Sequence, residues 1–153
     1  MSILDKDSWH IPKYWRQHDV EPLIFEFYRI NNCGEIISLL SKKRMKPTMD
    51  PDYKYVSLFH PEIFEPKNKN PRKGKKFRIH KLVACTFLPN TNRHLYNVVD
   101  HKDGDKTNNC VYNLEWVTYS ENTRRAFNKT KENNINIIEI PINQLSLFPD
   151  EKK

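Results

Sequence analysis

The sequence of 153 residues is short of several features that define large classes of proteins. No apolar run approaches the roughly 20 residues that a helix needs to cross a bilayer, so we expect no membrane span. Residues 1–7 include acids and lack the apolar stretch of a signal peptide, so we expect a protein that is not secreted.

Cysteine is also scarce. The chain has three, Cys33, Cys85 and Cys110, and no CxxC pair, which argues against a structural zinc site and against a disulfide framework. We therefore predict reduced thiols and an intracellular protein.

Acidic residues are missing from one long stretch. The chain carries 26 Lys+Arg against 19 Asp+Glu, a net charge of +7, yet no acid lies between Glu65 and Asp100. This segregation predicts a surface that binds nucleic-acid phosphates, and a solvated charged loop is the alternative. The cations that we predict to contact nucleic acid are Lys67, Lys69, Arg72, Lys73, Lys75, Lys76, Arg78 and Lys81.

The first 60 residues predict a small antiparallel sheet. Strand-like segments at 25–30 and 35–40 flank the turn 31–34, whose Asn and Gly residues are a hairpin signal. A further strand is expected at 53–59, and the prolines of 61–76 indicate a loop.

The next 50 residues predict a mixed module. A strand at 77–80 leads into a helix at 81–87, and strands at 96–101 and 114–117 flank a polar loop at 102–109. Thr118 and Glu121 form a capping box that predicts the start of a helix running to about residue 127.

Residues 96–126 place four chemically useful side chains in this strand–loop–strand–helix segment. Asp100 and His101 end the first strand, Asn113 precedes the second, and Asn122 lies at the start of the helix. A carboxylate and an amide oxygen can hold a hard cation, and an imidazole can accept a proton near neutral pH. An isolated Asp-His pair is more often part of a turn, so this evidence becomes specific only with its context.

The context resembles the motif of HNH endonucleases. The segments that carry the resemblance are IHKLVACTFLPN at 79–90, VVDHKDGDKTNN at 98–109 and NLEWVT at 113–118. They are most similar to phage intron-encoded homing endonucleases, and upstream segments resemble the small β module of those enzymes, so the resemblance covers about residues 9–128.

The resemblance implies an α+β fold, with an N-terminal antiparallel β module followed by a ββα-metal nuclease module. The implied divisions are residues 1–76, residues 77–128 and a tail at 129–153. It also implies that His101 is the general base, that Asn113 holds the loop and orients this histidine, and that Asp100 and Asn122 bind the metal. Many relatives have asparagine where this chain has Asp100, and that departure strengthens a metal site.

The implied function is a metal-dependent DNA endonuclease of the homing or nicking type. Oxygen ligands favour Mg²⁺ or Mn²⁺ over Zn²⁺. We expect DNA as the partner, no membrane, and a monomer rather than a dimer. The alternative is a domesticated, non-catalytic nucleic-acid-binding protein, for which the set of Asp100, His101, Asn113 and Asn122 has no use.

Overall fold

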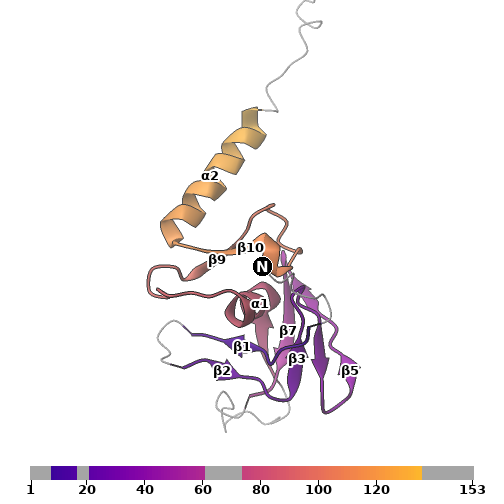
Figure 1. The fold of residues 1–153 in the computed structure, drawn as a ribbon. Helices are drawn as coiled ribbons and strands as arrows, with labels where there is room; N and C mark the ends of the chain where they lie inside the picture. The colour runs from indigo at the N-terminus through magenta and orange to yellow at the C-terminus, as the bar shows by residue number, and fades with distance from the viewer. Residues whose placement is uncertain (1–7, 17–20, 61–73, 136–153) are drawn as a thin grey trace, which may run out of the picture. The chain divides into compact units, whose positions relative to one another are not determined.

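The computed structural model describes residues 8–16, 21–60 and 74–135 (Figure 1). The chain divides into two compact units, Met1–Thr118 and Tyr119–Lys153, and each is described by itself. A search of the described residues finds no helix that is both long and apolar enough to cross a membrane.

Short antiparallel strands form the N-terminal part of the first unit. Strand β1 (Lys13–Tyr14) pairs with β2 (Leu23–Ile24). Strands β3 (Tyr28–Ile30), β4 (Ile36–Ser38) and β5 (Lys43–Arg44) form a second sheet in that order. The predicted antiparallel architecture is confirmed, although the strands are divided among several small sheets.

A third sheet connects this region to the following helix. It consists of β6 (Thr48–Asp50), β7 (Tyr53–Leu58) and β8 (Lys75–Arg78), with Val56 opposite Phe77. The expected loop 61–76 is shorter at its end, because Lys75 and Lys76 already pair with β7. Residues 61–73 of that loop lie outside the described residues.

Helix α1 (Ile79–Phe87) follows β8 directly and starts two residues before the predicted position. Its apolar residues Ile79, Leu82 and Val83 recur at helical spacing and are all buried. The helix ends because Leu88 precedes Pro89, and a residue before proline is restricted to extended conformations. Helix α1 packs against β1, β7, β8 and β10.

The hairpin after α1 consists of β9 (Val98–His101) and β10 (Leu114–Val117), which pair antiparallel. Their connection ends in the short 3₁₀ helix η2 (Val111–Asn113). Both strands were predicted from the sequence, and the fold class is confirmed as α+β.

One hydrophobic core serves the whole described part of the first unit. It takes side chains from both sides of residue 76: Leu23, Phe25, Tyr28, Ile30, Ile36, Val56 and Leu58 before it, and Phe77, Ile79, Leu82, Val83, Val111 and Leu114 after it. The β strands before residue 60 and the segments after residue 77 therefore stabilise each other. The predicted domain boundaries at residues 76 and 128 stay predictions.

The prediction of reduced thiols is wrong for two of the three cysteines. Cys33 and Cys110 form a disulfide across a sequence separation of 77 residues, whereas Cys85 is free and buried. The backbone N–H of Val111 donates to the carbonyl of Asn32 at 2.7 Å, which brings the two cysteine segments together. The pairing of Cys33 with Cys110 depends on the tertiary fold, so the spacing of the cysteines in the sequence does not reveal it.

In the second unit, helix α2 (Tyr119–Ile135) begins directly after Thr118, where the capping box predicts it. It continues well past the predicted end near residue 127, because residues 128–135 contain no proline or glycine that would end a helix. Within this extension the Thr130 hydroxyl donates to the Ala126 carbonyl at 3.0 Å.

Candidate active site

Strand β9 ends in Asp100 and His101. In the ladder with β10, Asp100 is opposite Glu115 and His101 is opposite Leu114. Successive strand residues point to opposite faces, so the carboxylates of Asp100 and Glu115 share the partly exposed face while His101 lies on the buried face with Leu114. One carboxylate oxygen of Asp100 also accepts a hydrogen bond from the backbone N–H of His101 at 2.8 Å.

Asn113 closes the loop between the two strands. Its side-chain oxygen accepts from the Asp103 backbone N–H at 3.1 Å, and its amide nitrogen donates to the Asp103 carboxylate and to the Asn108 carbonyl, both at 2.9 Å. Hydrogen bonds from Asn113 and Asn108 lower the pKa of Asp103, so this acceptor stays ionised. These contacts agree with the loop-holding part of the role expected for Asn113.

The ring of His101 contacts a different asparagine. The side chain of His101 is only 3% exposed, and its Nε2 lies 3.2 Å from the side-chain oxygen of Asn109, which is 4% exposed. The ring also packs edge-on against His80, with centroids 5.0 Å apart, and lies 6.3 Å from the ring of Tyr53. The contact that would orient the histidine is therefore made by Asn109.

His80, at the start of α1, is a buried histidine beside His101. Among the described residues its Nδ1 has no hydrogen-bond partner. Burial is the main cause that lowers the pKa of His80 to about 3, and the neighbouring His101, Arg78 and Lys81 lower it further. The low pKa of His80 means that its ring is neutral near pH 7.

Two cations surround the ring of Tyr53 next to the histidines. The guanidinium carbon of Arg78 lies 5.0 Å from the ring centroid, and Lys106 Nζ lies 5.2 Å from it. The Arg78 Nε donates to the Tyr55 hydroxyl at 3.0 Å, and Lys106 pairs with Asp52 at 2.8 Å. The two cations therefore lie against Tyr53, the residue whose ring is 6.3 Å from that of His101.

Four of the cations predicted to bind nucleic acid lie in β8 and α1. Lys75, Lys76 and Arg78 are exposed, and Lys81 is half-buried with its Nζ 5.9 Å from the Tyr14 ring. Lys76 also lies 3.7 Å from the Asp50 carboxylate. The other four, Lys67, Lys69, Arg72 and Lys73, lie outside the described residues.

The described residues of β9 and β10 fit a hard divalent cation through oxygen donors. Asp100 and Glu115 stand directly opposite each other, and carboxylate oxygens are the donors that a hard divalent cation takes. In the described part of the chain, no three His, Cys, Asp or Glu side chains gather as a metal cluster. Asn122, the other predicted ligand, lies on α2 in the second unit.

Sequence reasoning missed Asn109 as a contact of His101. Asn109 was part of an Asn-Asn pair that is typical of a turn, and nothing in the pair distinguishes the partly exposed Asn108 from the buried Asn109. The predicted hairpin was nevertheless a signal. The connection between two paired strands must return to the point where the first strand ends, so its last residues lie close to His101.

Comparison with known proteins identifies this segment. Residues 96–124 match the family model HNH_3, described as HNH endonuclease. The chain is 37% identical to the DNA endonuclease I-HmuI of Bacillus phage SP01 over 103 residues, which are 67% of this chain and 52% of that protein. It is 40% identical to the Uncharacterized HNH endonuclease L245 of Acanthamoeba polyphaga mimivirus over 103 residues, 67% of this chain and 28% of that protein.

A solved structure is also similar. The HNH homing endonuclease I-HmuI, in a structure described as showing DNA binding and cleavage, matches with a TM-score of 0.55 and 34% identity over 74% of this chain and 62% of that chain. The chain spans between 28% and 52% of the length of the two curated relatives named above. The resemblance drawn from the sequence is confirmed: residues 96–124 carry an HNH endonuclease motif.

Proposed function

We propose that this chain, with its HNH endonuclease motif, is a divalent-metal-dependent DNA endonuclease of the homing or nicking type. The observation that carries the proposal is the buried His101, which ends β9 inside the matched segment and has Asp100 beside it. The named relatives include a DNA endonuclease and HNH endonucleases, which supports DNA phosphodiester bonds as the substrate.

In the proposed mechanism, neutral His101 accepts a proton from the water that attacks phosphorus. Asn113 keeps the loop closed. Asp100 would bind Mg²⁺ or Mn²⁺ through its carboxylate oxygens, and Asn122 is proposed from the sequence alone as a further oxygen ligand. When bound, such an ion supplies positive charge for the phosphate and the leaving 3′ oxygen. The products would carry 5′-phosphate and 3′-hydroxyl ends.

Three exposed cations of β8 and a fourth cation near Tyr53 would contact the DNA backbone: Lys75, Lys76, Arg78 and Lys106. We propose that the chain acts as a monomer within a host cell. One active site per monomer then predicts a nick in one strand.

The test is plasmid nicking by the purified chain, with and without Mg²⁺ or Mn²⁺. We expect the wild type to relax supercoiled DNA only with the metal. His101→Ala should lower the nicking rate by roughly 10²–10⁴-fold, the range for one positioned acid–base group, while DNA affinity stays the same. His94→Ala is the matched control, since His94 is exposed and takes no part in the contacts of the site.

A chain that binds DNA but nicks no substrate with either metal would overturn the proposal. The non-catalytic nucleic-acid-binding protein would then take its place. Equal nicking by the wild type and His101→Ala would instead show that the activity comes from elsewhere or from a contaminant.

A further inference from the structure

The contact between His101 and Asn109 determines which ring nitrogen can act. An amide oxygen only accepts hydrogen bonds, so an Asn109 oxygen 3.2 Å from His101 Nε2 requires a proton on that nitrogen. A neutral imidazole carries one proton, which leaves Nδ1 unprotonated and able to accept another. The orientation of Asn109 therefore corresponds to one tautomer of the candidate general base.

Asn109 is itself held by a segment that has no catalytic residue. We call residues 31–35 the Asn31 turn and residues 102–109 the His101 loop. The turn reaches the end of the loop in two ways: the Val111 N–H donates to the Asn32 carbonyl at 2.7 Å, and Cys33 is disulfide-bonded to Cys110. The residue next to Asn109 in the chain is thus fixed covalently to the turn.

Gly34 brings the turn close to Asn109. A Cβ atom at Gly34 would lie 3.5 Å from the Asn109 Cβ, and 2.5 Å from Cγ2 of Ile79. Gly34 has a φ of +83°, which glycine adopts without strain. The backbone of the turn therefore forms the wall against which the buried Asn109 packs.

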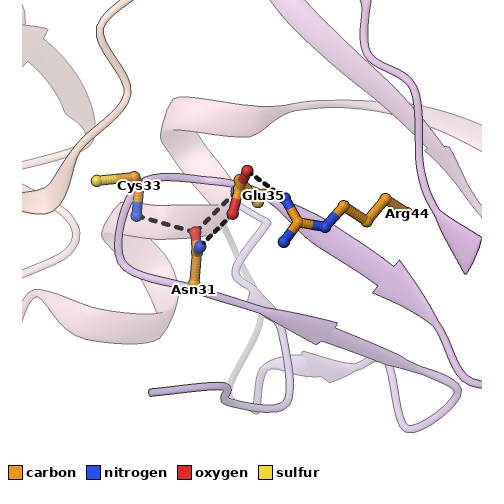
Figure 2. Close-up of polar contacts among 4 residues, drawn as sticks. All are labelled: Asn31, Cys33, Glu35 and Arg44. Atoms are coloured by element: carbon orange, nitrogen blue, oxygen red, sulfur yellow. Dashed lines mark hydrogen bonds and ion pairs between the residues drawn. The ribbon is translucent and has the colours of Figure 1, made fainter. Parts of the chain in front are cut away.

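The Asn31 turn is closed by its own hydrogen bonds, as Figure 2 shows. The side-chain oxygen of Asn31 accepts from the backbone N–H groups of Cys33 at 3.1 Å and Glu35 at 2.9 Å. Its amide nitrogen donates to the Glu35 carboxylate at 2.8 Å, and the other oxygen of that carboxylate accepts from Arg44 at 2.7 Å. These four hydrogen bonds lie within residues 31–44 and involve no residue of the His101 loop.

We propose that Asn109 is the positioning residue for His101: it fixes the ring with a proton on Nε2 and with Nδ1 available, and the Asn31 turn holds Asn109 in place. The role of Asn113 is then to hold the loop, and the role of orienting the histidine belongs to Asn109. This inference rests on the proposed function, because it assigns a catalytic purpose to the tautomer.

The first test is spectroscopic and needs neither DNA nor metal. Nitrogen-15 spectra of the full chain, labelled at histidine and recorded at pH 8, distinguish protonated from unprotonated ring nitrogens; His101→Ala assigns the His101 signals. We expect a proton on Nε2 in the wild type and a mixture of tautomers in Asn109→Leu. Asn109→Asp retains an acceptor oxygen and should retain the wild-type tautomer.

A proton on Nδ1 in the wild type would overturn the proposal, whatever the variants do. An unchanged tautomer in a folded Asn109→Leu protein would overturn it too. Because this test uses no substrate, the tautomer result stands even if the chain never cleaves DNA, and that failure would count against the proposed function alone.

The second test is kinetic. Asn109→Leu should lower kcat for nicking by about 10–100-fold with KM nearly unchanged, as for other residues that orient a ligand or base, and Asn109→Asp should restore part of it. Asn92→Leu makes the same change at an exposed position and should leave kcat unchanged. In the His101→Ala background, Asn109→Leu should cause no further loss, whereas an equal additional loss would mean that Asn109 acts without His101.

Discussion

The Asn31 turn and the His101 loop are built alike. Each is organised by a buried asparagine, Asn31 or Asn113, that bonds to backbone groups and to one carboxylate. Each contains a glycine at positive φ, +83° at Gly34 and +80° at Gly104. Yet the loop lies between His101 and Asn113, two residues of the candidate active site, whereas the turn contains no residue of that site.

The two segments differ in how deeply their glycines are buried. Gly34 is buried and its missing side chain leaves room for Ile79, whereas Gly104 and its neighbours in the loop are exposed. The His101 loop is thus linked to the Asn31 turn from outside, through Cys33 and Cys110, which lie 77 residues apart in the sequence. The N-terminal β region contributes to the shape of the site as well as to the core.

His80 lies next to Ile79, between the turn and the loop, and its replacement should have the largest effect. Its pKa falls from 6.5 to about 3 on folding, through burial and through the nearby His101, Arg78 and Lys81. Between those pH values the unfolded chain binds more protons than the folded one, so stability falls as the pH falls. His80→Phe should remove a loss on the order of 4 kcal/mol between pH 6.5 and pH 3.

Urea unfolding of both proteins at several pH values measures this difference. The stability of His80→Phe should decline less steeply below pH 6.5 than that of the wild type. His94→Phe, at an exposed histidine, is the control and should follow the wild type. Parallel curves for wild type and His80→Phe would show that His80 is protonated in the folded protein.

Reducing the disulfide that joins the Asn31 turn to Cys110 should have the next largest effect on stability. Reducing the Cys33–Cys110 disulfide should lower the free energy of unfolding by about 2–4 kcal/mol, because it releases a long loop in the unfolded chain. Unfolding with and without dithiothreitol measures this, and Cys110→Ser should be insensitive to the reductant. The unfolded, non-reduced wild type should show one reactive thiol, Cys85; three would contradict the pairing.

Reducing conditions also bear on the proposed location. Inside a cell, glutathione and thioredoxin keep most thiols reduced, so the bond would be open there. The Val111 to Asn32 backbone hydrogen bond and the packing at Gly34 would then hold the two segments together. Tautomer spectra of His101 in dithiothreitol would show whether these contacts suffice.

The sequence predicted the strands and the candidate residues of the site better than the contacts that hold those residues in place. Residue type singled out Asp100, His101 and Asn113 as candidates, but their roles came from the resemblance to HNH endonucleases, because an isolated Asp-His pair is more often part of a turn. The strands β7, β9 and β10 were also found, since alternating β-formers mark them. Asn109 and the Cys33–Cys110 pair were missed, because their roles depend on contacts between distant segments.

Substituting the two glycines compares the segments directly. Gly34→Ala should cost about 2–3 kcal/mol, from the strained backbone and from the collision with Ile79. Gly104→Ala should cost about 1 kcal/mol, from the backbone alone. Urea unfolding measures both, and Gly34→Ala should also disturb the His101 tautomer. Equal costs would show that the turn is no more tightly packed than the loop.

The smallest effect is expected for the ion pairs that accompany the two segments. Arg44 and Glu35 lie 2.7 Å apart with side chains 68% and 50% exposed, and Lys106 and Asp52 lie 2.8 Å apart with side chains 45% and 57% exposed. Exposed pairs contribute less than about 1 kcal/mol, so Arg44→Gln and Lys106→Gln should each change unfolding by no more than that. Differential scanning fluorimetry at low and high salt measures both.

The effect of Asn31→Ala on stability should be compared with that of Arg44→Gln, because both residues bond to Glu35. Asn31→Ala leaves the backbone N–H groups of Cys33 and Glu35 without their acceptor, which should cost about 1–3 kcal/mol and change little with salt. A larger loss for Arg44→Gln than for Asn31→Ala would mean that charge shapes the turn. A larger loss of stability for Asn31→Ala would mean that the buried Asn31 amide determines the shape of the turn. The backbone that packs against Asn109 would then change little with ionic strength.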